Sequence, residues 1–107
     1  MNQNWRIFLA RIAPPGAILG FSAAEFAVEV AINLRYCLNL VQPTPECFDL
    51  AELVLLRAQN YGEARMGDKS LLFAEAEDAL AQATRLLELE LEYCSRGNLK
   101  ETCEQAA

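Results

Sequence analysis

The segment 21–41, FSAAEFAVEVAINLRYCLNLV, constrains the fold more than any other stretch, because it is the longest apolar segment with clear helix signals. Ser22 and Glu25 have the spacing of a capping box, in which two side chains satisfy backbone N–H groups at a helix start. A single polar stripe remains on this helix: Ser22, Glu25, Glu29, Asn33 and Tyr36. A helix with so narrow a polar face is buried inside a bundle or shared with a second subunit.

Two positions of that stripe, Glu29 and Asn33, are open to two interpretations. They either form hydrogen bonds with a neighbouring helix and fix its register, or they are exposed to solvent.

A second helix is predicted over about 45–62. Thr44 is a good N-cap, and Pro45 is favoured at the first helical position. Gly62 weakens a helix by about 1 kcal/mol relative to alanine, so the chain is expected to turn shortly after it.

A third helix is predicted over about 69–95. Ser70 can cap its start, and Gly97 can provide a left-handed stop after its end. Residues 87–93, LELELEY, alternate as in a strand, but leucine and glutamate are good helix formers and the preceding turns carry the helix onward.

A short helix is also expected at each end of the chain. Residues 4–12 place four apolar side chains on one face of an amphipathic arm, which Pro14-Pro15-Gly16 then breaks: Trp5, Phe8, Leu9 and Ile12. Such a short helix is marginal alone in water, so it must dock on its own bundle, on a partner or on a membrane surface. At the other end, residues 98–101 resemble a capping box and predict a short helix through Cys103.

These elements predict an all-α fold, a small helical bundle of three main helices with a short N-terminal helical arm and a short C-terminal helix. At 107 residues the chain is one domain at most, with an arm over 1–16 and a single helical domain over 17–107. The first two main helices carry more apolar surface than three helices bury among themselves, which favours a homodimer.

Composition argues against several function classes. The chain is 53% hydrophobic and 22% charged, so it should fold. A net charge of -6, with nine dispersed Lys and Arg, argues against nucleic-acid binding. Histidine is absent, which removes the commonest general base and metal ligand. We therefore expect no enzyme activity, no cofactor and no metal site.

The N-terminal region has basic residues and an apolar run like those of a secretion signal, but we do not expect it to be one. Arg11 interrupts its apolar run, and Pro14-Pro15-Gly16 follows at once. The run 17–41 is long enough to span a bilayer, but its two carboxylates and one arginine would each cost about 2.5 to 3.5 kcal/mol there. A cytoplasmic protein is therefore expected.

Four cysteines are the sharpest chemical feature: Cys37, Cys47, Cys94 and Cys103. If the three main helices run up, down and up, all four thiols lie near one end of the bundle. Three states are then open. Local disulfides Cys37–Cys47 and Cys94–Cys103 would each stabilise by about 2 to 4 kcal/mol. A four-thiolate zinc site would lack the usual short C-x2-C spacing. Free thiols would serve as small buried side chains in a reducing cytosol.

Two short segments resemble known families. One segment resembles the closing hairpin of the small redox-controlled linker protein that joins Calvin-cycle enzymes: Tyr93-Cys94, then eight residues, then Cys103. This resemblance covers less than a fifth of the chain. Residues 77–89 are similar to the second helix of a tetratricopeptide repeat, although no period of about 34 residues recurs. Neither resemblance assigns a partner.

The sequence thus predicts a non-enzymatic protein-protein interaction module, an adaptor or assembly factor, with a redox response through the two cysteine pairs as one version of this role. The alternative is a peripheral membrane-associated component anchored by the apolar face of the N-terminal arm.

Overall fold

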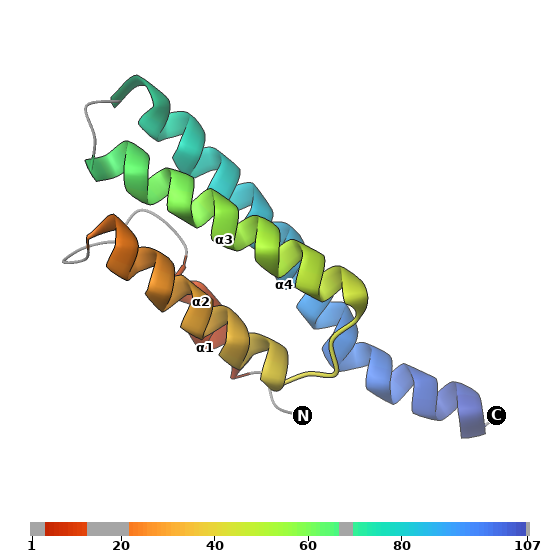
Figure 1. Cartoon of the computed structure of the whole chain (residues 1–107). Helices are drawn as coiled ribbons and strands as arrows, with labels where there is room; N and C mark the ends of the chain where they lie inside the picture. Colours follow the sequence, from red (N-terminus) through yellow and green to blue (C-terminus); the bar gives the residue numbers. More distant parts are fainter. Residues whose placement is uncertain (1–3, 13–21, 67–69, 107) are drawn as a thin grey trace.

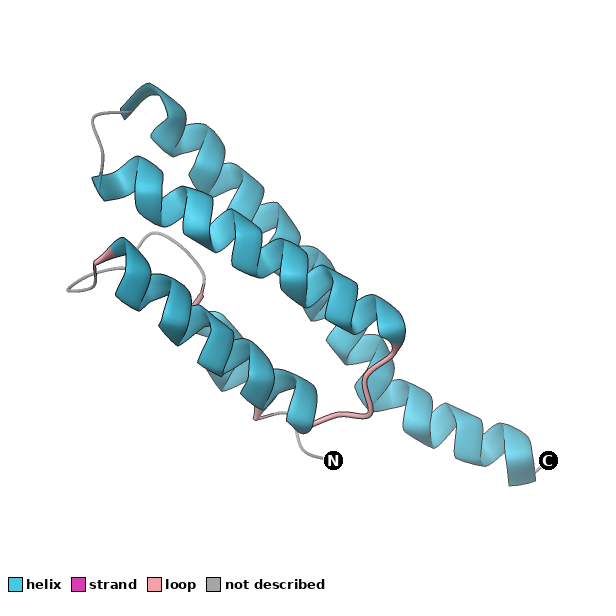
Figure 2. Ribbon diagram, in the orientation of Figure 1, coloured by secondary structure: helices cyan, strands magenta, loops and turns pink. Residues whose placement is uncertain are grey.

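The computed structural model describes residues 4–12, 22–66 and 70–106, so the predicted break at Pro14-Pro15-Gly16 lies outside the described residues. Within these ranges the only regular secondary structure is helical, and Figure 1 and Figure 2 show the helices running roughly side by side. Their bounds are α1 Trp5–Ala10, α2 Ala23–Asn39, α3 Pro45–Met66 and α4 Ser70–Ala106. The predicted all-α bundle is confirmed.

α2 begins where the capping signal predicts. The Oγ of Ser22 accepts a hydrogen bond from the backbone N–H of Glu25 at 3.2 Å and donates to Oε1 of the same residue at 3.1 Å. Asn33 fits neither interpretation of the polar stripe. It is only 2% exposed, yet its Nδ2 has no hydrogen-bond partner among the described residues.

α3 begins at Pro45 as predicted, and the backbone N–H of Cys47 donates to Oγ1 of Thr44 at 3.3 Å. Its end was predicted too early, because the helix continues through Gly62 to Met66. A Cβ at Gly62 would lie 3.4 Å from the Cα of Ala23, so the small residue lets α2 and α3 approach closely. Packing of this face offsets the cost of about 1 kcal/mol that glycine adds to a helix.

The predicted end of the third main helix near residue 95, and the separate C-terminal helix after it, are wrong. α4 continues without a break through Gly97 to Ala106, and its last part extends beyond the other helices in Figure 1. Each residue that extends the helix adds one backbone hydrogen bond, which offsets the cost of about 1 kcal/mol that Gly97 adds. A helix of 37 residues is about 55 Å long, which accounts for most of the 58 Å long axis of the molecule.

α3 lies between α2 and α4, and α1 closes the bundle by packing mainly on α2 and less extensively on α4. One hydrophobic core runs through all four helices, with Trp5, Phe26, Tyr61 and Leu87 among its fully buried side chains. Trp5 and Leu9 of α1 therefore belong to the same core as α2, α3 and α4.

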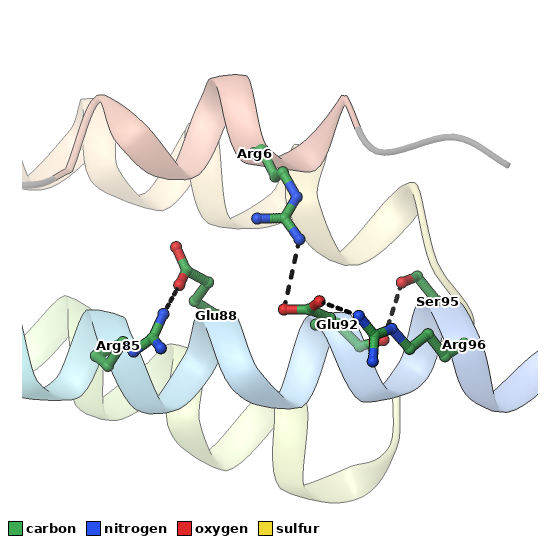
Figure 3. Close-up of polar contacts among 6 residues, drawn as sticks. All are labelled: Arg6, Arg85, Glu88, Glu92, Ser95 and Arg96. Atoms are coloured by element: carbon green, nitrogen blue, oxygen red, sulfur yellow. Dashed lines mark hydrogen bonds and ion pairs between the residues drawn. The ribbon is translucent and has the colours of Figure 1, made fainter.

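Ion pairs on the surface add a second contact between α1 and α4. Figure 3 shows Arg6 of α1 facing Glu92 of α4 at 3.4 Å, with Arg96 on the other oxygen of that carboxylate at 2.7 Å. Exposed pairs of this kind contribute about 1 kcal/mol or less. The docking of α1 therefore depends mainly on its buried apolar side chains.

Candidate functional site

Three of the four cysteines lie in the core, near the end of the bundle where α2 ends and α3 begins. Cys37, Cys47 and Cys94 are buried free thiols. Cys47 and Cys94 lie in contact, and the side chain of Cys103 lies outside the described residues.

The pairing of these thiols differs from both disulfides considered from the sequence. The Sγ of Cys47 lies 3.2 Å from the Sγ of Cys94, whereas the Sγ of Cys37 donates to the backbone oxygen of Trp5 at 3.2 Å. Cys94 and Cys103 are nine residues apart on one helix, or about 13 Å along its axis. A disulfide needs Cα atoms within about 7 Å, so the hairpin implied by the linker-protein resemblance cannot close. Spacing in the sequence was a poor guide because adjacent helices bring distant residues together.

A hydroxyl and a carboxylate complete what we call the thiol-carboxylate cluster, formed by Thr44, Cys47, Glu90 and Cys94. The Oγ1 of Thr44 donates to Oε2 of Glu90 at 2.9 Å and lies 3.5 Å from the Sγ of Cys47. The donor atoms of Cys47, Glu90 and Cys94 all lie within 4.8 Å of one another.

The local sequence explains how the cluster forms. Glu90 and Cys94 are four residues apart, so they lie one turn apart on the same face of α4. Thr44 and Cys47 belong to the N-cap turn of α3. Sequence reasoning found the two cysteines and the cap but missed Glu90, whose spacing from Cys94 is the signal that could have pointed to it.

Burial sets the protonation of these thiols. Desolvation raises the pKa of Cys47 to about 11, against an opposing hydrogen bond from Thr44. Desolvation likewise raises the pKa of Cys37 to about 12. Both groups are therefore neutral thiols near pH 7, and the thiolate that would make them nucleophilic is scarce.

α1 docks on the other helices of its own chain. Trp5, Leu9 and Ile12 are buried in the core, and the ring of Phe8 stacks on that of Tyr36 with centroids 4.9 Å apart. The apolar face that a membrane anchor would need is thus occupied within the protein. Among the described residues, none of the helices is both long and apolar enough to cross a bilayer.

A shallow groove of about 300 Å³ opens between α2 and α3. We call it the α2-α3 groove, and its lining is mostly apolar: Ala31, Leu34, Arg35, Leu38, Asn39, Phe48, Ala51, Glu52 and Leu55. Phe48 is 51% exposed. Arg35 and Glu52, the two charged residues of the lining, form no ion pair among the described residues.

Comparison with known proteins gives no match: no family model fits the sequence, and neither a curated protein nor a solved structure is significantly similar to it. The function is therefore inferred from the geometry of the cluster and of the groove.

Proposed function

We propose that the protein is a non-enzymatic protein-protein interaction module, an adaptor or assembly factor, whose binding surface is the α2-α3 groove. The observation that carries this proposal is the groove itself, an apolar depression between two packed helices. Grooves of this kind accept the apolar face of an amphipathic helix.

The surface beside the groove is also apolar. Val28 and Ile32 are exposed on α2. Val28 lies four residues before Ile32, and Ile32 lies three residues before Arg35, so all three share one helix face. Contiguous exposed apolar surface of this kind is typical of interaction sites on soluble proteins.

The partner we propose for the groove is a second copy of this chain. The groove carries one cation, Arg35, and one carboxylate, Glu52, and both lack an ion-pair partner in the described part of the chain. In a contact with two-fold symmetry, every contact between two different residues occurs twice, once with each copy contributing each residue. Arg35 of each copy would then pair with Glu52 of the other, so one interface satisfies all four charges.

The compartment we propose for this module is the cytoplasm. The support is that the three described cysteines are free thiols, as expected where disulfides are kept reduced.

Analytical ultracentrifugation at micromolar concentration tests the homodimer. We expect the wild-type chain to sediment as a dimer and Phe48→Glu to weaken it at least about 100-fold, because each dimer would bury two charged side chains in place of two phenylalanines. Leu86→Glu is the matched control, since Leu86 on α4 lies outside the groove and is 50% exposed. It should leave the dimer intact.

A charge exchange tests the proposed pairing. Arg35→Glu and Glu52→Arg should each weaken the dimer about 10-fold, because each places like charges opposite one another. The double variant Arg35→Glu/Glu52→Arg should restore it. A wild-type chain that stays monomeric would contradict the homodimer, and a double variant as weak as either single one would contradict this pairing.

A further inference from the structure

We propose that the thiol-carboxylate cluster is a metal site for zinc, with Cys47, Cys94 and Glu90 as the protein ligands and a fourth position beside the hydroxyl of Thr44. This site lies within one chain and is independent of the groove. It differs from the four-thiolate site weighed from the sequence, because Cys37 is turned away to the backbone oxygen of Trp5.

The distances between the donor atoms suit a tetrahedral zinc ion. With Zn–S bonds of about 2.3 Å and Zn–O bonds of about 2.0 Å, a tetrahedron has S···S edges of about 3.8 Å and S···O edges of about 3.5 Å. The two sulfur atoms are 3.2 Å apart, and all three donor atoms lie within 4.8 Å of one another. Small rotations of the side chains are therefore enough to admit the ion.

The donor types select the class of metal. Two thiolates favour a borderline-soft ion over magnesium or calcium, which prefer oxygen ligands, and a carboxylate is a common third ligand of zinc. Among the described residues Glu90 forms no ion pair, and the one hydrogen bond to its side chain comes from Thr44. This carboxylate is thus half-buried beside two thiols without a cation to balance it.

The first turn of α3 supplies further stabilisation. Two thiolates, one carboxylate and Zn²⁺ carry a net charge of -1. Cys47 lies in the first turn of α3, where the helix dipole favours negative charge. The bound ion would tie the start of α3 to α4 directly after the connector between α2 and α3.

The binding step is balanced without any redox change. Each thiol gives up its S–H proton to solvent as a Zn–S bond forms, so two protons are released for each ion, and Glu90 adds a Zn–O bond. Zinc stays in the +2 state throughout. Because both thiols must lose their protons to bind the ion, zinc affinity should rise with pH.

The test begins with the full chain, reduced and stripped of metal with a chelator. Titration with Co²⁺ should give one ion per chain and a thiolate-to-cobalt charge-transfer band whose intensity corresponds to two thiolates. Addition of Zn²⁺ should then abolish the band. If the wild-type chain gives no such band, or a band whose intensity corresponds to four thiolates, the proposal is overturned regardless of the results for the variants.

Variants locate the site. Cys47→Ser and Cys94→Ser should each lose the charge-transfer band at equimolar cobalt, and Glu90→Gln should weaken zinc binding about 10-fold or more. Cys37→Ser and Cys103→Ser are the matched controls and should bind as the wild type does. Wild-type affinity in Cys47→Ser or Cys94→Ser would overturn the assignment. The dimer-disrupting variant Phe48→Glu should still bind zinc, which separates this site from the proposed interaction surface.

Discussion

At the scale of single residues, Cys37 shows how burial rather than reactivity can govern a thiol. It is fully buried, and its Sγ donates to the backbone oxygen of Trp5 across the contact between α1 and α2. Desolvation raises the pKa of this thiol from 9.0 to about 12, so the folded protein keeps a proton that the unfolded chain releases near pH 9.

This difference predicts how stability depends on pH. Below pH 9 both states hold the proton and Cys37 contributes no pH dependence. Between pH 9 and about 12 the unfolded state binds fewer protons, so the free energy of unfolding should fall as pH rises, by up to about 1.4 kcal/mol per pH unit for this thiol. Urea denaturation at pH 8, 9, 10 and 10.5 measures the slope.

Cys37→Ser is the control for this slope. Its hydroxyl can still donate to the oxygen of Trp5, but it does not titrate in this range. The variant should therefore lose stability less steeply above pH 9. Equal slopes for the two proteins would show that the thiol of Cys37 is not the group responsible.

Residues that act locally were predictable, and those that act across helices were not. The cap formed by Ser22 and Glu25 involves only neighbours in the sequence, and it is present as predicted. Asn33 and Glu90 depend on which helix covers them, information that a pattern of 3.6 residues per turn does not contain.

At the scale of elements, α1 shows how a six-residue helix can be held in place. Trp5 is completely buried, whereas Ile7 on the opposite side of α1 is 58% exposed. Isolated helices of this length are marginal in water, so these contacts supply the stability of the helix.

Trp5→Ala should therefore destabilise the protein by about 3 to 5 kcal/mol, as expected when a large aromatic side chain is removed from a packed core. Ile7→Ala, on the same helix, should change stability by about 0.5 kcal/mol or less. Urea denaturation followed by circular dichroism compares the two variants.

The fluorescence of Trp5 reports whether α1 is docked on the bundle, since Trp5 is the only tryptophan in the chain. Its fluorescence in the native wild-type protein should be blue-shifted and protected from acrylamide. A solvent-exposed spectrum under native conditions would show that α1 does not dock on the bundle.

The starts of the elements were predicted better than their ends. N-caps at Ser22 and Thr44 set the starts of α2 and α3 through local hydrogen bonds. Gly62 and Gly97 were expected to end helices, but each lies inside one. A glycine costs a helix only about 1 kcal/mol, so packing or continued backbone hydrogen bonding decides whether it ends there.

At the scale of the whole molecule, part of the apolar surface that the bundle leaves exposed lies at and beside the α2-α3 groove. Val28 and Ile32 lie beside the α2-α3 groove and Phe48 lines it, all at least 45% exposed. If two copies associate there, folding and association are linked, and the thermal midpoint depends on protein concentration.

A tenfold increase in concentration should then raise the midpoint of the wild-type chain by about 3 °C or more, because association adds about 1.4 kcal/mol per dimer. Phe48→Glu should show a midpoint independent of concentration over the same range. Differential scanning calorimetry measures both, and a wild-type midpoint that does not move would contradict the dimer.

The sequence alone determined the helical class, the capped starts of α2 and α3, and the amphipathic character of the N-terminal arm, because these depend on interactions between residues at most four apart. Only the tertiary structure decided that Cys47 faces Cys94 with Glu90 beside them, that Trp5 and Leu9 of α1 are buried in the shared core, and that a groove remains open between α2 and α3. Those features depend on which helix faces pack together, and all the contacts of the core together determine that packing.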